Sequence, residues 1–188
     1  EHALAWKLAN EAPVEALWCV PGNDGMAPPI RRAELAATDL NGLVRFVREQ
    51  GIDLTLVGPE TPLVAGLADR FAAEGLAVVG PSAEAARLEG SKVFAKEFLA
   101  RHGIPTARFE VHRLPASALE SLSSGRFQFP VVIKADGLAA GKGVVIVPDL
   151  PQARRALAEI MEDRIFGAAG DQVVLEEFLT GEEASVMV

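Results

Sequence analysis

The feature that most constrains the fold is a regular alternation of short apolar runs and amphipathic segments in the first half of this 188-residue chain. The runs at 15–20, 52–57 and 76–79 are too short for a buried helix and have the length of a buried strand. Residues 61–71, between the last two runs, have helical periodicity. Strand, helix and strand in this order predict a parallel, Rossmann-like α/β sheet, whose ligands bind beyond the carboxyl ends of its strands.

Helix-capping residues support this prediction. Asp39 precedes apolar residues that share one helix face, and Gly51 follows them, which predicts a helix between the two. Thr61 is predicted to cap the next helix, with Pro62 at its first position. Residues 21–29 are rich in glycine and proline and predict a loop.

The pattern changes after Gly103. The four strands predicted here lie at 106–112, 130–134, 143–147 and 172–178. Only two helical segments separate them, one at 115–123 and one that begins at Asp149, so this part predicts an α+β unit. We expect an N-terminal α/β domain at 1–90, a connecting helix at 91–105 and a second domain at 106–188.

Composition excludes several classes of protein. Hydrophobic residues make up 49% and charged residues 23% of the chain, which excludes a disordered tail. The net charge of −8 disfavours sequence-independent binding of nucleic acid. No apolar run approaches the ~20 residues of a membrane helix, and no leader is expected. The single cysteine, Cys19, indicates a buried thiol in a reducing compartment. A first residue other than Met leads us to expect a segment of a longer protein.

A long loop rich in glycine and lysine lies between two of the predicted strands. Its sequence from Lys134 to Gly143 is KADGLAAGKG. Glycines let backbone amides approach phosphate oxygens, and lysines neutralise phosphate charge. The loop differs from a Walker A loop in its glycine spacing and because a strand, not a helix, follows it. Hairpin loops usually have only ~2–5 residues, so a flexible flap over phosphates is the better interpretation.

Two weaker signals accompany this loop. Glu176 and Glu177 lie at the end of the last predicted strand, where backbone groups can bind an adenine, and Glu183 could bind a ribose. Lys92 begins a helix, where the helix dipole disfavours a cation unless an anion is near. Alone, each signal is more often solvated surface. The three histidines have no metal-ligand spacing, which disfavours a zinc site.

Taken together, these segments resemble the ATP-grasp ligases, and most closely the glycinamide ribonucleotide synthetase (phosphoribosylamine–glycine ligase) family. The resemblance rests on EHALAW at 1–6, PGNDG at 21–25, VGPE at 57–60, LEGSK at 88–92, VIKADGLAAGKG at 132–143 and EEFLTGEEAS at 176–185. It implies a pre-ATP-grasp substrate domain that is truncated at its start, followed by the lid domain of an ATP-grasp fold, with the remainder of that fold absent.

The same resemblance implies roles for individual residues. Two lysines would contact the phosphates of ATP, the glycine-rich loop would cover them, and the segment after the last strand would hold adenine and ribose. The implied ATP-binding residues are Lys92, Lys134, Asp136, Gly137, Gly141, Lys142, Gly143, Glu176, Glu177, Leu179 and Glu183. Asn23, Gly25 and Glu60 are the implied contacts of phosphoribosylamine. No catalytic residue is assigned, and the ligands of Mg²⁺ or Mn²⁺ are expected beyond Val188.

The implied enzyme joins glycine to 5-phosphoribosylamine in de novo purine biosynthesis, through a glycyl phosphate, and releases ADP and phosphate. We expect a cytoplasmic monomer without nucleic-acid or membrane partners, and an inactive segment when it is isolated. One alternative is another ATP-grasp carboxylate–amine ligase or a biotin-carboxylase-like enzyme, which shares the lid and differs in the second substrate. Alternatives of another class are a Rossmann oxidoreductase and a non-catalytic nucleotide-binding module.

Overall fold

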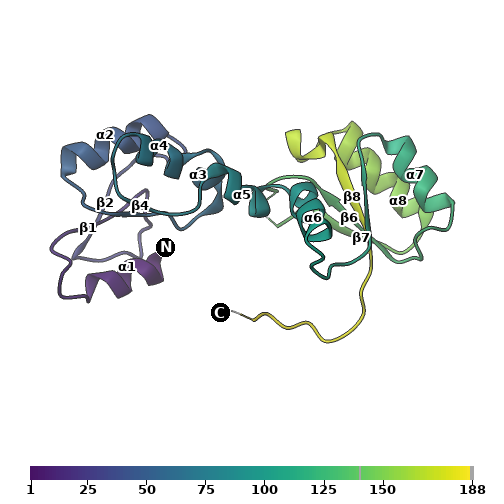
Figure 1. Ribbon diagram of the computed structural model, residues 1–188, viewed down its shortest axis with the longest axis horizontal. Coiled ribbons are helices and arrows are strands. Elements are labelled where there is room, and N and C mark those ends of the chain that lie inside the picture. The colour runs from purple at the N-terminus through teal and green to yellow at the C-terminus, as the bar shows by residue number, and fades with distance from the viewer. Residues whose placement is uncertain (140, 187–188) are drawn as a thin grey trace. The chain divides into compact units, whose positions relative to one another are not determined.

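The structure is a computed structural model that describes residues 1–139 and 141–186 (Figure 1). The chain divides into two compact units, an N-terminal unit at Glu1–Arg87 and a C-terminal unit at Leu88–Val188. The boundary falls within helix α5 (Ala83–Gly90). No helix in the described part of the chain is long and apolar enough to cross a bilayer.

The N-terminal unit contains short parallel strands and helices. Its elements are α1 (His2–Ala9), β1 (Leu17–Cys19), β2 (Ile30–Arg32), α2 (Leu40–Gln50), β3 (Thr55–Leu56), α3 (Glu60–Val64), α4 (Leu67–Ala73) and β4 (Val78–Val79). Strand β1 pairs with β2 and β3 pairs with β4, both in parallel. The parallel pairing predicted between the strands at 52–57 and 76–79 is confirmed by β3 and β4, but the strand at 15–20 pairs with β2 instead, and the described residues of this unit form two separate two-stranded sheets.

Helix α2 forms where the sequence predicts it. The Asp39 carboxylate accepts a hydrogen bond from the Gly42 amide at 2.9 Å, and Gly51 ends the helix at φ +62°. The apolar face of α2 packs against Leu67 and Phe71 of α4. Cys19 is half-buried, and burial raises the pKa of its thiol, which favours the unreactive protonated form.

The helix expected at 61–71 in the N-terminal unit is wrong. Residues 61–71 do not form one helix capped by Thr61: α3 begins at Glu60, with Pro59 at the N-cap. Gly66, at φ +89°, separates α3 from α4, because a left-handed residue cannot continue a helix. Strand β2, for which no prediction was made, forms in a stretch without an apolar run, and its backbone pairs with β1.

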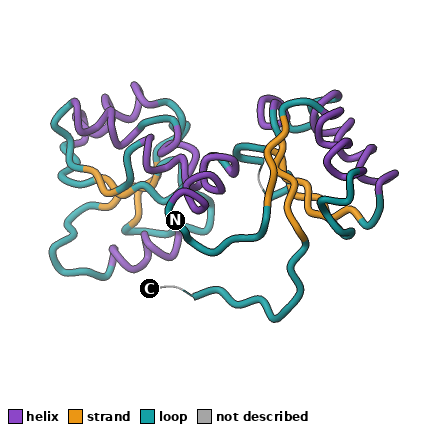
Figure 2. Tube along the Cα trace, turned by 45° about the vertical axis from the view of Figure 1, so that its right-hand side comes forward, coloured by secondary structure: helices purple, strands orange, loops and turns teal. Residues whose placement is uncertain are grey.

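The C-terminal unit is an antiparallel sheet with helices on both faces (Figures 1 and 2). After α5 come α6 (Lys92–Arg101), β5 (Phe109–His112), α7 (Pro115–Ser123), β6 (Val131–Ala135), β7 (Val144–Val147), α8 (Leu150–Leu157), the π-helical η1 (Ala158–Glu162), the 3₁₀ helix η2 (Gly167–Asp171) and β8 (Val173–Glu177). The strand order is β5-β8-β6-β7, with every pair antiparallel. The α+β prediction is confirmed.

The two faces of this sheet differ in character. On one face, Ile133 and Leu175 are fully buried against α7 and α8, in the main hydrophobic core of the unit. Side chains alternate along a strand, so Lys134 and Glu176 lie on the opposite face. Helix α6 lies against that opposite face, which we call the α6 face. The predicted phosphate-binding lysines therefore lie away from the main core.

Candidate functional site

A buried carboxylate binds two lysines on the α6 face. Glu176 of β8 is only 4% exposed. Its Oε1 lies 2.8 Å from Lys134 Nζ on the adjacent strand β6, and its Oε2 lies 2.9 Å from Lys96 Nζ on α6. We call these three residues the lysine cluster. One carboxylate cannot neutralise two ammonium groups, so the cluster carries an excess positive charge.

The two lysines differ in exposure. The Lys96 side chain is 12% exposed, and its Nζ also contacts Thr106 Oγ1 at 2.6 Å. The Lys134 side chain is 26% exposed. Lys134 is thus the more accessible cation, whereas the Lys96 ammonium group contacts both Glu176 and Thr106. A partly buried positive charge attracts an anionic ligand more strongly than one in open water.

An apolar surface continues from Lys134 along the same face. Val144 of β7 is in register with Lys134, and Ile146 is in register with Val132. Val144 is 44% and Ile146 is 55% exposed. Exposed β-branched side chains beside a cation can receive a ligand that has both an apolar ring and a negative charge.

The beginning of the glycine-rich loop is fixed to α6. Asp136 Oδ1 accepts hydrogen bonds from Ser91 Oγ at 2.9 Å and from the Val93 amide at 3.1 Å, and Gln172 Nε2 donates to Oδ2 at 2.6 Å. Lys92 Nζ donates to the carbonyl oxygen of Gly137 at 2.8 Å. Lys92 and the loop, which the sequence predicts to act together, are therefore in direct contact.

Backbone geometry explains the glycines of the loop. Gly137 and Gly141 have φ of +99° and +76°, which disfavour other residues. A Cβ on Gly143 would lie 2.7 Å from the Cβ of Ala139, so this position has no room for a side chain. The predicted loop includes Ala140, which lies outside the described residues. Lys142 is exposed, and its amide donates to the Ala139 carbonyl at 2.9 Å.

The predicted adenine and ribose contacts lie at the end of β8 and in the segment that follows it. Glu177 is tied to Arg108, whose amide donates to the Glu177 carboxylate at 2.7 Å. Leu179 is 66% exposed, and Glu183 lies in an exposed segment without helix or strand. The structure thus brings Lys134 and Glu176 together, and Lys92 and Gly137 together, whereas Glu183 contacts neither pair within the described residues.

The predicted substrate residues of the N-terminal unit lie near a cavity of that unit. Asn23 Oδ1 accepts a hydrogen bond from the Gly25 amide at 2.9 Å, which closes a tight turn. Asn23 and Pro59 line a cavity of about 210 Å³. Glu60 follows Pro59 as the first residue of α3. The turn and the start of α3 therefore approach each other from separate parts of the chain.

Sequence reasoning missed four contributors to these sites. Lys96 had a usable signal, because it lies one helical turn after Lys92 on a predicted helix. Ser91 also had one, since a serine before a helix is a common N-cap. Gln172 and His2 had no such signal in the sequence. Gln172 is 36 residues from Asp136 along the chain, and the His2 ring would lie about 3.4 Å from a Cβ placed on Gly25.

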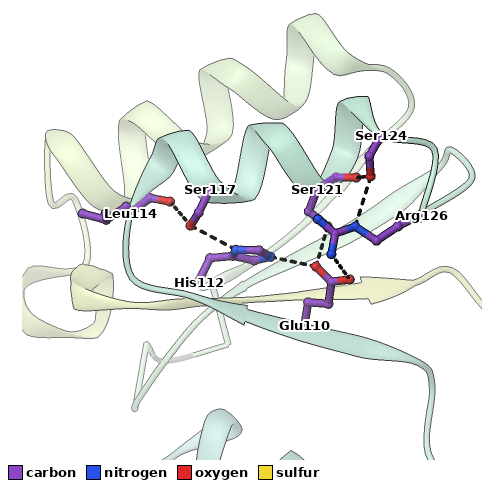
Figure 3. A network of polar contacts seen from close by, with 7 residues as sticks. All are labelled: Glu110, His112, Leu114, Ser117, Ser121, Ser124 and Arg126. Carbon is purple, nitrogen blue, oxygen red and sulfur yellow. Dashed lines mark hydrogen bonds and ion pairs between the residues drawn. The ribbon is translucent and has the colours of Figure 1, made fainter.

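A further polar network occupies the other face of the same sheet, between β5 and α7 (Figure 3). Glu110 contacts Ser121 Oγ, and its Oε2 lies 3.2 Å from His112 Nε2. His112 Nδ1 lies 3.1 Å from Ser117 Oγ. Burial lowers the pKa of His112, although the adjacent Glu110 carboxylate acts in the opposite direction. This network joins a strand to a helix and is separate from the lysine cluster.

Metal ligands do not gather in the described residues. No group of three or more His, Cys, Asp or Glu side chains there could hold a metal ion. The carboxylates nearest the loop, Asp136 and Glu176, are bound by protein donors instead. These residues therefore do not fit a divalent-metal site.

Comparisons with known proteins agree with this architecture. Residues 1–89 match the family model of the phosphoribosylglycinamide synthetase N domain, and residues 90–188 match that of its ATP-grasp (A) domain. The phosphoribosylamine–glycine ligase of Chlorobaculum tepidum is 52% identical over 99% of this chain and 44% of its own length. The Escherichia coli K12 enzyme of that name is 49% identical over 100% of the chain and 44% of its own length.

Solved structures give the same result. The phosphoribosylamine–glycine ligase of Thermotoga maritima superposes with a TM-score of 0.74 and 32% identity, over 96% of this chain and 42% of its own. The biotin carboxylase domain of Hydrogenobacter thermophilus 2-oxoglutarate carboxylase, solved with MgADP and bicarbonate, has a TM-score of 0.66 at 19% identity, over 82% of this chain and 35% of its own. That second likeness supports the fold alone. The chain spans about 44% of the length of these curated relatives.

Proposed function

Because the chain belongs to the phosphoribosylglycinamide synthetase family, we propose that the longer protein that contains it joins glycine to 5-phosphoribosylamine with ATP. The products are glycinamide ribonucleotide, ADP and phosphate, and the intermediate is a glycyl phosphate. The C-terminal unit supplies the lid that holds ATP, and the N-terminal unit supplies contacts to phosphoribosylamine. The observation that carries the proposal is the lysine cluster beside a glycine-rich loop.

The dimensions of the C-terminal unit support a nucleotide as ligand. Glu177 is in register with Val131, three positions before Lys134 on β6. At ~3.4 Å per residue, the end of β8 and Lys134 are about 10 Å apart along the strand. An extended nucleoside triphosphate spans a distance of this order. The base would lie toward Leu179 and the exposed face of β7, and the phosphates toward Lys134 and the loop.

The role of this unit in the reaction is mainly positioning. Phosphoryl transfer requires in-line geometry and neutralisation of charge more than covalent chemistry by the protein. Lys134 and Lys92 would contact phosphate oxygens, and Gly141, Lys142 and Gly143 would cover them and exclude water. Water exclusion matters because an acyl phosphate hydrolyses readily. Glu183 would accept hydrogen bonds from the ribose, and no general base is assigned.

For the N-terminal unit we propose one parallel, Rossmann-like sheet. Strands β1 and β3 belong to separate pairs, and both line an apolar cavity of about 200 Å³. Thr55 Oγ1 on β3 is buried and has no hydrogen-bond partner among the described residues. A strand supplied by the remainder of the longer protein would fill the cavity and join the pairs. Phosphoribosylamine would bind near Asn23, Gly25 and Glu60, beyond the strand ends.

We propose the domain limits 1–90, 91–105 and 106–188, and we place the ligands of a divalent metal in the remainder of the longer protein. A metal-bound nucleotide in a neighbour of the same fold supports the use of Mg²⁺. No step above depends on residues of this chain as metal ligands. A monomeric state and a cytoplasmic location stay predictions.

The test uses the full-length enzyme and measures ATP-dependent phosphate release with alternative second substrates. Release should require glycine and phosphoribosylamine together, and bicarbonate or formate should not replace them. The Lys134→Ala variant should fold and lose at least 100-fold in kcat/KM, because it lacks a phosphate contact. Lys7→Ala, which removes an exposed lysine of α1, is the matched control and should leave turnover unchanged. Release that depends on bicarbonate would favour a biotin-carboxylase-like enzyme instead.

A further inference from the structure

Asp136 is the most completely bonded polar side chain near the loop. It lies directly after β6 and receives donors from three sources: the Ser91 hydroxyl, the Val93 amide and the Gln172 side chain. Its own amide donates to the Gln172 carbonyl at 3.1 Å. The residue therefore joins the start of α6, the end of β6 and the residue before β8.

This bonding disfavours direct contact between Asp136 and a nucleotide. Both of its carboxylate oxygens already accept hydrogen bonds from protein donors. A negatively charged carboxylate would also repel a triphosphate beside it. The carboxylate also occupies the N-terminus of α6, where the helix dipole favours a negative charge. A phosphate group is thus excluded from that helix end.

The backbone of the next residue, Gly137, is also fixed by contacts within the protein. The Gly137 carbonyl accepts a hydrogen bond from Lys92 Nζ at 2.8 Å. An ideal Cβ on Gly137 would lie 3.4 Å from the Cβ of Ala169, so the backbone packs closely against η2. An ammonium group has three donors, so Lys92 can keep this contact and still bind a phosphate oxygen.

We propose that Asp136 is a positioning residue that anchors the glycine-rich loop to α6, so that Lys92 and the loop amides meet the phosphates as one preassembled unit. Its carboxylate fixes both the backbone from which the loop starts and the helix end from which Lys92 projects. The inference rests on the proposed function, since it assigns Asp136 to ATP binding through the loop. The anchor itself can be measured without nucleotide.

The experiment compares Asp136→Asn with Asp149→Asn in the full-length enzyme. Asp149 caps α8 in a matching way, accepting from the Gln152 amide at 2.9 Å and from the Gln152 side chain at 3.2 Å. It does not contact the loop among the described residues. Both substitutions weaken a helix cap, but only Asp136→Asn alters the start of the loop.

Amide hydrogen exchange is measured first, in the absence of nucleotide. Asp136→Asn should speed exchange at least tenfold at the amides of residues 93 and 136. Asp149→Asn should speed exchange only at Gln152. Unchanged exchange at residue 136 in Asp136→Asn would overturn the anchor, whatever the enzyme is found to catalyse.

Steady-state kinetics then test the positioning role. Asp136→Asn should raise the KM for ATP at least tenfold, change kcat less than threefold and leave the KM for glycine unchanged. Gln172→Met, which removes one donor and keeps the carboxylate, should raise the KM for ATP about threefold and serves if the first variant folds poorly. The positioning role would be refuted if the KM for ATP stayed within twofold of wild type in both Asp136→Asn and Gln172→Met. It would also be refuted if Asp149→Asn raised the KM for ATP as much as Asp136→Asn does. If the wild-type enzyme turns over no ATP, the proposed function fails, and exchange alone decides the anchor.

Discussion

Replacing Glu176 by glutamine should destabilise the C-terminal unit far more than a typical loss of an ion pair. Glu176 is buried and is the shared partner of Lys134 and Lys96. Glutamine keeps the shape but removes the charge, so two lysines of low exposure lose their counter-ion. Removing one partner of a buried pair costs about 3–5 kcal/mol. Because Lys134 is 26% exposed, we expect the lower end, about 3 kcal/mol.

The assay is native-state hydrogen exchange at the amides of β6 and β8, which reports the opening of this unit alone. A loss of about 3 kcal/mol corresponds to exchange roughly 100-fold faster. The matched control is Glu159→Gln, since Arg155 Nε and Glu159 Oε1 are also 2.8 Å apart but exposed. Exposed pairs contribute about 0–1 kcal/mol, so the control should change exchange less than fivefold.

A triple variant separates stability from function. Replacing Lys96, Lys134 and Glu176 together by methionine removes all the buried charges and leaves none unpaired. Such replacements are often neutral or stabilising, so stability should return to within about 1 kcal/mol of wild type. ATP binding should still be lost. Equal exchange rates in Glu176→Gln and Glu159→Gln would contradict this prediction, because burial would then have no effect on the free-energy cost of losing the carboxylate charge.

Three further predictions address separate elements. The pKa of His112 is lowered in the folded state, so the unfolded state binds more protons just below pH 6.5. The amides of β5 should therefore lose protection from exchange as the pH falls through that range. The His112→Asn variant should show a smaller pH dependence. Gly143→Ala, whose Cβ would lie 2.7 Å from that of Ala139, should cost about 1–3 kcal/mol in thermal unfolding and raise the KM for ATP. Asp39→Ala, which removes the cap of α2, should cost about 1 kcal/mol, followed by the fluorescence of Trp18, which contacts α2 through Phe46.

Elements with a local cause could be predicted from the sequence. Asp39 and Asp149 cap their helices through hydrogen bonds to residues three positions on, so the signal and the contact lie together. Pro115 begins α7 because proline fits the first turn of a helix. The glycine-rich loop can be predicted because its positive-φ positions, Gly137 and Gly141, favour glycine, which is visible in the sequence.

Contacts between distant residues could not be predicted in this way. From its sequence position, Glu176 is expected at an adenine-binding edge, and in the structure its side chain binds two lysines, one of them on a helix. Gln172 approaches Asp136 only because β8 lies beside β6. Strand β2 depends on its partner β1 and has no apolar run of its own. Tertiary pairing determines each of these features, and a single sequence carries no local record of it.

The proposed function requires the α6 face and the glycine-rich loop to bind a nucleoside triphosphate. The most direct test is the change in amide exchange when ATP is added to the full-length enzyme, with GTP as a control for the base. We predict at least tenfold slower exchange with ATP at residues 134–139 and 141–143 and at 176–179, and a smaller effect with GTP. Unchanged exchange at these residues, at an ATP concentration that saturates turnover, would show that ATP does not bind there.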